Sequence, residues 1–209
     1  MCKKNKFSVL NISGVILAGG TNRRFNGVTK GMVVIDGKTI VSRVIDTIKD
    51  LFNEIIIVTN TPEEFKEFTN CIIVPDHFKM AGPLGGIHAA LKTASGDAVF
   101  VFAGDMPLLN KDLIIRQIEC YNKTKCDVLV PLIGKNIEPL HAIYNITITK
   151  VLEKQLIDET DYAVRKLFKR LNVNYLELED SEDVRNSFFN VNTQSDLLLV
   201  EKILNIRTY

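Results

Sequence analysis

Three short runs of this chain contain almost no polar side chain, and they constrain its fold more than any other feature. They span residues 14–18 (GVILA), 55–59 (IIIVT) and 98–103 (AVFVFA). A strand that is apolar on both sides of its pleat must be covered on both faces, which is typical of a parallel sheet flanked by helices. We therefore expect these runs to form the buried centre of such a sheet.

Helical patterns alternate with the apolar runs. Three of them carry start signals: Thr61-Pro62-Glu63-Glu64, Asn110, and Thr193 with Asp196 as a capping box. The pattern predicts helices near residues 39–51, 61–64, 84–94, 110–120, 147–157, 162–171 and 195–204, and further strands at 71–74, 127–131, 139–144 and 174–178. This alternation predicts one three-layer α/β/α domain with a mostly parallel sheet, spanning residues 14–209 after an N-terminal tail of residues 1–13.

Charge and cysteine content narrow the class of protein. Lys+Arg 26 against Asp+Glu 25 gives a formal net charge of +1, and the basic cluster Lys3, Lys4 and Lys6 is short, so a nucleic-acid role is disfavoured. No stretch approaches the roughly 20 apolar residues that cross a bilayer, and we expect a cytoplasmic protein without membrane contact. The four cysteines form no C-x-x-C pair, which favours reduced, mostly buried thiols.

In parallel α/β sheets a ligand binds beyond the carboxyl ends of the strands, where the strand order reverses. The residues that directly follow the first four predicted strands are Gly19-Gly20, Asn60, Pro75-Asp76 and Gly104-Asp105. We expect the functional site among them.

The segment after the first run has the composition of a phosphate site. Gly19 and Gly20 allow the backbone N–H groups to approach an anion, and Arg23, Arg24 and Lys30 can neutralise a triphosphate. The segment lacks the lysine of a Walker A loop at the required position, and the chain has no G-x-G-x-x-G fingerprint.

Two aspartates and one glycine-rich segment add to this site. Asp105 ends a buried strand, and a single carboxylate with phosphate oxygens suffices to bind Mg²⁺. Asp76 either accepts hydrogen bonds from a nucleotide or is a surface loop residue. The segment 82–86 (GPLGG) opens a helix, where Gly86 and its neighbours let a ligand approach the N–H groups, although a plain turn explains it equally well.

The histidines carry less information. We expect His88 to be solvated on its helix. Whether His141, on a strand near the crevice, contacts a substrate stays open.

Five motifs occur in a fixed order along the chain. They are L-A-G-G-x-x-x-R-x-x-G-x-x-K at residues 17–30, G-P-L-x-G at 82–86, G-D-M-P-L at 104–108, P-L-x-A-x-Y at 139–144 and F-x-N-V-N-T at 188–193. This order resembles the molybdenum cofactor guanylyltransferases of the nucleotidyltransferase superfamily. Cytidylyl relatives usually have A-A-G at the glycine pair, which this chain lacks. The resemblance implies a Rossmann-like, nucleotide-diphospho-sugar transferase-like fold.

The resemblance also implies roles for single residues. Arg24 and Lys30 would hold the triphosphate of GTP, and Asp105 would bind Mg²⁺ and the phosphates. Asn190 and Asn192 would lie on the molybdopterin side, and superfamily relatives use an equivalent residue as a second metal ligand. Nucleotide contacts are implied at Leu17, Ala18, Gly19 and Asp76, and at Val58 through its backbone only.

The implied reaction transfers GMP from GTP to molybdopterin and releases pyrophosphate. Proteins that deliver molybdopterin or accept the finished cofactor are implied as partners, without being identified. The chain departs from the family pattern at Phe25, Asn26 and Thr29. Two alternatives remain: a related nucleotidyltransferase that uses CTP or a sugar phosphate, and a catalytically silent nucleotide-binding module of the same fold.

Overall fold

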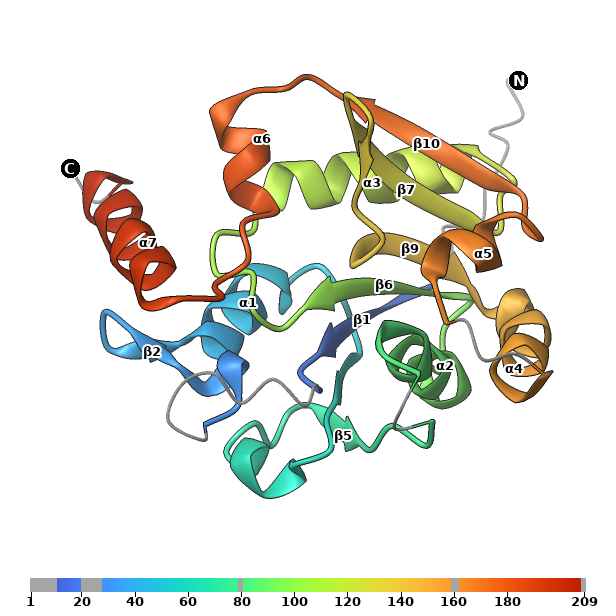
Figure 1. Cartoon of the computed structure of the whole chain (residues 1–209), viewed down its shortest axis with the longest axis horizontal. Coiled ribbons are helices and arrows are strands. Elements are labelled where there is room, and N and C mark those ends of the chain that lie inside the picture. The colour runs from blue at the N-terminus through green and yellow to red at the C-terminus, as the bar shows by residue number, and fades with distance from the viewer. Residues whose placement is uncertain (1–10, 20–27, 79–80, 159–161, 208–209) are drawn as a thin grey trace, which may run out of the picture.

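The chain folds around one eight-stranded sheet (Figure 1). The computed structural model describes residues 11–19, 28–78, 81–158 and 162–207. Strand order is β10-β7-β9-β6-β1-β4-β5, and β8 pairs with β7. The strands are β1 (Ile12–Leu17), β4 (Ile55–Val58), β5 (Ile72–Val74), β6 (Ala98–Ala103), β7 (Val128–Ile133), β8 (Asn136–Ile137), β9 (His141–Asn145) and β10 (Val173–Leu178).

The sheet is mostly parallel, as the apolar runs predict. β1 pairs in parallel with β4 on one side and with β6 on the other. β9 is antiparallel to both β6 and β7, and β8 is antiparallel to β7. The first strand begins two residues before its predicted start, at Ile12.

Seven α-helices are described. They are α1 (Ile40–Ile48), α2 (Pro83–Thr93), α3 (Lys111–Lys123), α4 (Thr149–Asp158), α5 (Val164–Phe168), α6 (Glu182–Ser187) and α7 (Gln194–Arg207). As predicted, Asn110 caps α3, and Thr193 and Asp196 cap each other at the start of α7. No helix in these described segments is long and apolar enough to span a membrane.

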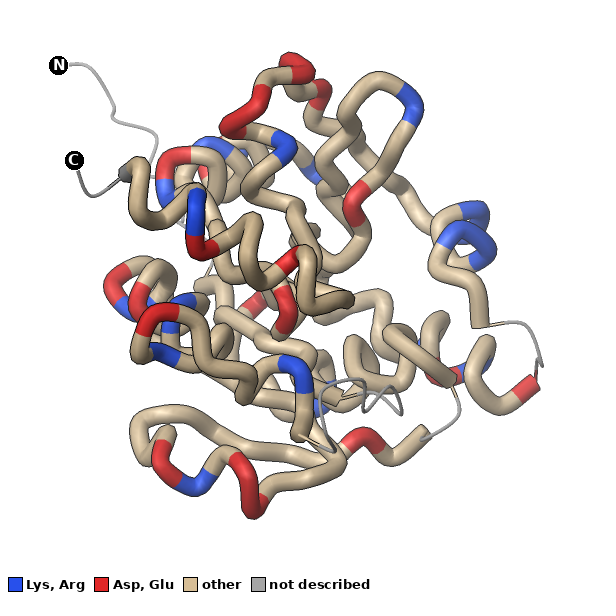
Figure 2. Tube along the Cα trace, turned by 60° about the vertical axis from the view of Figure 1, so that its left-hand side comes forward, with Lys and Arg blue, Asp and Glu red and all other residues tan. Residues whose placement is uncertain are grey.

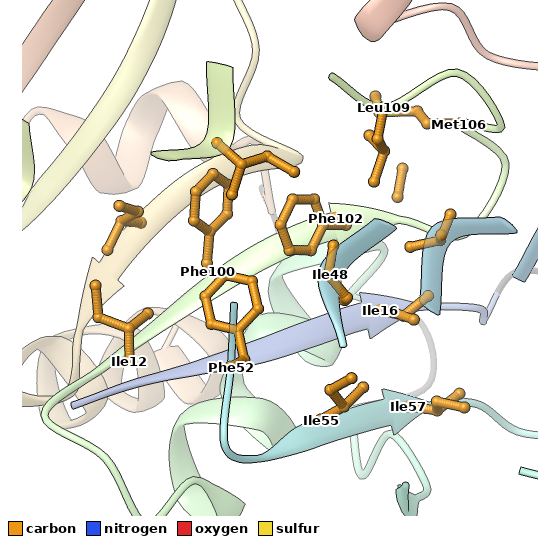
Figure 3. Packing of buried hydrophobic residues seen from close by; sticks show 14 of the residues in the cluster. Ile12, Ile16, Ile48, Phe52, Ile55, Ile57, Phe100, Phe102, Met106 and Leu109 are labelled. Atoms are coloured by element: carbon orange, nitrogen blue, oxygen red, sulfur yellow. The ribbon is translucent and has the colours of Figure 1, made fainter. Parts of the chain in front are cut away.

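The two faces of the sheet bury separate cores. On one face, side chains of β1 and β6 pack with α1 and α3, and on the other face they pack with α2, α4 and α5. Figure 3 shows the first core, in which Phe52 meets Phe100 and Phe102 edge-on, with ring centroids 5.9 and 6.0 Å away. Both strand phenylalanines are fully buried, and each such ring contributes about 1.5–3 kcal/mol.

A third, smaller core fastens the C-terminal helix to the rest of the molecule. It joins Leu197 and Val200 of α7 to Val191, to Leu108 after β6, and to Ile35 and Ile40 near the start of α1. Ile35 belongs to the hairpin of β2 (Val34–Ile35) and β3 (Lys38–Thr39), beside which α7 lies in Figure 1. This third core ties together segments that are far apart in the sequence.

The start signal at Thr61 does not produce an α-helix. The segment forms only the 3-10 turn η2 (Pro62–Phe65), and no hydrogen bond to the Thr61 side chain caps it. Glu64, the last residue of the start signal, accepts a hydrogen bond from the backbone N–H of Thr29 at 3.2 Å. A tertiary contact has displaced the local one.

Sequence reasoning missed several short elements, among them β2, β3, β8 and α6. The β2–β3 hairpin turns at Asp36 and Gly37, which adopt φ angles of 47° and 73°. Asp-Gly is the residue pair that such a two-residue turn favours, so the signal was present. The helix α6 is capped by Ser181, whose side chain accepts a hydrogen bond from the N–H of Val184.

In the part of the chain that the structure describes, the charged residues and the cysteines are distributed over the fold without forming a single cluster. Figure 2 shows basic and acidic residues interspersed along the described chain rather than gathered on one face. Cys71, Cys120 and Cys126 are free thiols, the first two half-buried and the third buried.

Candidate active site

The site lies where the sheet reverses its strand order. After β1 the chain builds β4 and β5 on one side, and it then returns to place β6 on the other side of β1. The turns that follow β1 and β6 are joined, because the N–H of Gly104 donates to the carbonyl of Leu17 at 3.0 Å. A Cβ on Gly104 would lie 2.9 Å from that oxygen, so glycine is required for this approach.

Three distant segments meet at this edge in one polar cluster. The ammonium Nζ of Lys30 lies 3.3 Å from Oδ2 of Asp105 and 2.7 Å from Oδ1 of Asn192. The side chains of Lys30 and Asp105 are 16% and 22% exposed. We call Lys30, Asp105 and Asn192 the Lys30 cluster. It brings together two predicted phosphate and metal residues with one predicted for the molybdopterin side.

Packing of the next residue fixes Lys30 in place. Lys30 begins the 3-10 turn η1 (Lys30–Met32), and Gly31 follows it. A Cβ on Gly31 would lie 2.6 Å from Cγ2 of Val41 and 3.1 Å from the carbonyl oxygen of Gly104. Glycine therefore lets η1 press against both α1 and the turn that carries Asp105.

Burial dominates the electrostatics of Asp105. Loss of solvent raises the pKa of its carboxyl group, and the neighbouring Lys30 ammonium offsets part of this effect by favouring the charged form. A half-buried carboxylate interacts more strongly with a cation than an exposed one, because less water screens the charge. Asp105 is thus suited to hold a positive partner.

The segment before α7 carries Asn192 into the cluster. The N–H of Val191 donates to the carbonyl oxygen of Asp105 at 2.9 Å, so this segment lies along the turn after β6. Asn190 behaves differently, because its side chain donates to the carbonyl oxygen of Phe188 within the same segment. Of the two predicted asparagines, the structure brings Asn192 to Lys30.

Asp76 lies at the start of α2 rather than on the surface. It is 8% exposed, and its Oδ1 accepts from the N–H of Phe78 at 2.8 Å. A Cβ on Gly85 would lie 2.6 Å from the same oxygen, so this glycine admits the carboxylate to the first turn of the helix. Burial raises the pKa of Asp76. The alternative of a surface loop residue is wrong.

Two of the predicted ligand-binding glycines differ in what surrounds them. A Cβ on Gly86 would meet Cδ2 of Leu17 at 3.1 Å, so packing accounts for this glycine. At Gly19 the nearest atoms of the described residues would be the carbonyl oxygen of Val58 at 3.8 Å and Nδ2 of Asn60 at 4.0 Å, which are ordinary contacts. Gly19 is exposed, so the fold leaves its surface open to a ligand. Ligand contact at both positions stays a prediction.

The backbone at the end of β1 already has partners within the protein. The N–H of Ala18 donates to the carbonyl oxygen of Val58 at 2.9 Å, and the carbonyl of Leu17 accepts from Gly104. Val58 is 2% exposed in the core, so its side chain offers nothing to a nucleotide. The nucleotide contacts predicted at Leu17, Ala18 and Val58 therefore depend on backbone atoms alone. Gly20, Arg23 and Arg24 lie outside the described residues.

The structure corrects the expectation for His88 and settles that for His141. His88 is 4% exposed, because α4 covers the outer side of α2. His141 is fully buried among the rings of Phe100, Phe102 and Phe188, at centroid distances of 5.2, 5.3 and 4.9 Å. It has no surface through which to contact a substrate.

A lysine–aspartate pair after β6, where a mostly parallel sheet reverses its strand order, is typical of nucleotide-binding α/β proteins. Comparison with known proteins agrees with this class. Residues 14–175 match the family model described as the MobA-like NTP transferase domain.

The relatives are similar over nearly their whole length. A "Probable molybdenum cofactor guanylyltransferase" of Natranaerobius thermophilus is 37% identical over 93% of this chain and 97% of its own. A "Molybdenum cofactor guanylyltransferase" of Desulfosudis oleivorans is 34% identical over 89% and 92%. The solved structure of molybdopterin-guanine dinucleotide biosynthesis protein A from Archaeoglobus fulgidus has a TM-score of 0.78, with 28% identity over 93% of this chain and 99% of its own. The chain belongs to the MobA-like NTP transferase family, within the molybdenum cofactor guanylyltransferases.

The buried histidine predicts a pH dependence of stability. Burial lowers the pKa of His141 from 6.5 to about 4, so between these values the unfolded chain binds a proton that the folded protein does not. We expect this group to lower the free energy of unfolding by up to about 1.4 kcal/mol per pH unit as the pH falls through that window. Urea unfolding of the wild type and of His141→Leu, compared from about pH 7.5 to 4.5, isolates the effect. Parallel stability curves would contradict it.

Proposed function

We propose that this enzyme transfers GMP from GTP to molybdopterin through the Lys30 cluster, forming the molybdenum guanine dinucleotide cofactor. The observation that carries the proposal is the meeting of Lys30, Asp105 and Asn192 at the carboxyl ends of β1 and β6. Family membership supports the donor and the acceptor.

The transfer is a displacement at the α-phosphorus of GTP. An oxygen of the terminal phosphate of molybdopterin forms the new P–O bond. The bond from the α-phosphorus to the bridging oxygen breaks, and pyrophosphate leaves with the electron pair. Such a reaction needs positioning and charge stabilisation more than covalent help from the protein. Lys30 places an ammonium group where it neutralises charge on the departing pyrophosphate, and Arg24 would add to this.

The residues present fit a divalent metal, and Mg²⁺ is the ion we propose. Oδ2 of Asp105 and Oδ1 of Asn192 both face the Lys30 ammonium, so two oxygen donors converge on one positive group. No group of three or more His, Cys, Asp and Glu that could hold a metal occurs in the described part of the chain. One carboxylate with phosphate oxygens is the ligand set that Mg²⁺ accepts, and when bound it neutralises the α- and β-phosphates. Asp105 would be its principal protein ligand.

The nucleotide would lie over the turn after β1. Gly19 presents an open backbone there, with Gly20 next to it, and the side chains of Asn60 and Asp76 lie on the adjacent side. Oδ1 of Asn60 accepts from the N–H of Asp76 at 3.3 Å, which orients its amide. Donors and acceptors in this region are suited to read the polar edge of guanine.

The base selectivity tests the proposed donor. A site that pairs with O6, N1 and N2 of guanine leaves polar groups unsatisfied when adenine enters, at about 1–3 kcal/mol for each group. We expect GTP to bind at least about 10²-fold more tightly than ATP, measured by calorimetry with GTP, ATP and CTP in the presence of Mg²⁺. Gly19→Ala should weaken GTP binding without loss of stability, because the fold leaves room for the methyl group. Equal affinities would contradict the guanylyl assignment, and tighter CTP binding would favour a cytidylyl enzyme.

The role of Asp105 predicts the outcome of its removal. Asp105→Ala should abolish GMP transfer at saturating Mg²⁺ and leave the circular dichroism spectrum unchanged, because the main metal ligand is lost while the strand is not. Asp46→Ala is the matched control, since Asp46 is an exposed carboxylate on α1 that pairs with Lys38 of the hairpin and with Lys49 just after the helix. Turnover of Asp105→Ala close to that of this control would exclude Asp105 as the metal ligand.

Lys30 is expected to act mainly in the transfer step. Lys30→Ala should lower kcat by about 10²-fold or more, because the ammonium group gains importance as pyrophosphate separates. Lys49→Ala removes an exposed lysine from an ion pair and serves as control. If only the KM for GTP rises, Lys30 contributes equally to ground state and transition state, and its proposed role is wrong.

A further inference from the structure

We propose that Asp196, at the start of α7, is a positioning residue of the active site: it holds the backbone of Asn192 so that the Asn192 side chain sets the place of the Lys30 ammonium. This inference rests on the proposed function, because it assigns the Lys30 cluster to the reaction.

Asp196 grips the backbone at Asn192 itself. Its Oδ2 accepts from the N–H of Asn192 at 2.8 Å and from the N–H of Thr193 at 2.7 Å. Oγ1 of Thr193 accepts in return from the N–H of Asp196 at 3.2 Å. These bonds therefore do more than cap a helix, because one of the two N–H groups that donate to Asp196 belongs to Asn192, the residue that binds Lys30.

Asn192 is held on its other side as well. The preceding residue, Val191, is fully buried in the third core, and its N–H donates to the carbonyl oxygen of Asp105. On the helix side, the hydrogen bonds from the N–H groups of Asn192 and Thr193 to Asp196 hold the segment. Between these two anchors, the backbone of Asn192 has little freedom, and its Oδ1 stays directed at Lys30.

The anchor on the helix side is held by packing in the third core. Leu197 follows Asp196 directly and packs with Val200 in the third core, against Ile35 and Ile40. Ile35 lies within the segment that leads from Lys30 to α1, and Ile40 is the first residue of that helix. The third core thus fixes Asp196 and the Lys30 segment relative to one another, and Asp196 transmits this placement to Asn192.

The two partners of Lys30 differ in their distance from it. Asn192 lies at 2.7 Å, and Asp105 at 3.3 Å. Without the two bonds from Asp196, the backbone at Asn192 loosens and the amide leaves Lys30, which then moves toward Asp105. A displacement of about 1 Å at a reacting centre can cost on the order of 10²-fold in rate. We expect about a tenfold loss from this indirect change.

The experiment compares Asp196→Ala with Asp196→Asn. Both backbone N–H groups donate to the same oxygen of Asp196, so the amide oxygen of asparagine can accept both bonds while the negative charge is removed. We expect kcat for GMP transfer to fall about tenfold in Asp196→Ala, and most of this loss to be recovered in Asp196→Asn, with the KM for GTP little changed. Equal impairment of the two variants would assign the effect to charge and overturn the inference.

A double-mutant cycle tests whether Asp196 acts through Asn192. In an Asn192→Ala background, Asp196→Ala should lower kcat no further, because the side chain that it positions is absent. Equal losses in both backgrounds would overturn the inference.

Asn145→Ala is the matched structural control. Asn145 also accepts hydrogen bonds from backbone and side chain at the start of a helical turn, but it lies beside Ala98, at the opposite end of β6 from Asp105. Asn145→Ala should lower the melting temperature and leave kcat unchanged. If Asp196→Ala behaves like this control while Asn192→Ala is impaired, only the present inference fails. Full activity of Asn192→Ala would remove Asn192 from the active site and overturn the proposed function as well.

Discussion

The parallel pairing of β1 with β6 is the contact on which the rest of the structure depends. It aligns Leu17 with Ala103, so both strands end at the same level and their turns are joined by the bond from Gly104 to Leu17. Gly19, predicted to bind phosphate, and Asp105, predicted to bind metal, therefore follow strand ends that lie side by side. That pairing also divides the core into its two faces, since β1 and β6 contribute side chains to both. A shift of one residue in register would turn these side chains to the opposite face.

The third core holds the three segments of the active site together. It is small, yet it joins the hairpin after Lys30, the loop after Asp105 and the helix after Asn192. Each residue of the Lys30 cluster is thus within a few positions of an apolar side chain in the same core. Hydrophobic packing, which has no direction of its own, here sets the distance between charged groups. The positions of the polar groups at this site therefore depend on the neighbouring apolar contacts.

Much of the fold was predictable because its signals are local and strong. Residues 98–103 form a strand with the predicted bounds, and Asn110 and Thr193 cap the predicted helices. Predictions failed where a tertiary contact replaced a local one, as when Glu64 bonded to Thr29 instead of capping its own helix. His88 was expected in solvent because one helix in a sequence does not reveal what covers its outer side. In the structure α4 covers it.

The sequence by itself determined the class of fold, the family, and the residue types at the site, because each apolar run and each motif consists of residues close together in the chain. Only the tertiary structure decided that Asn192 rather than Asn190 reaches Lys30, that Asp76 is buried against α2, and that His141 is enclosed by aromatic rings. The physical reason is distance along the chain. Lys30 and Asn192 are separated by 162 positions, and their contact exists only because the sheet and the third core bring them together.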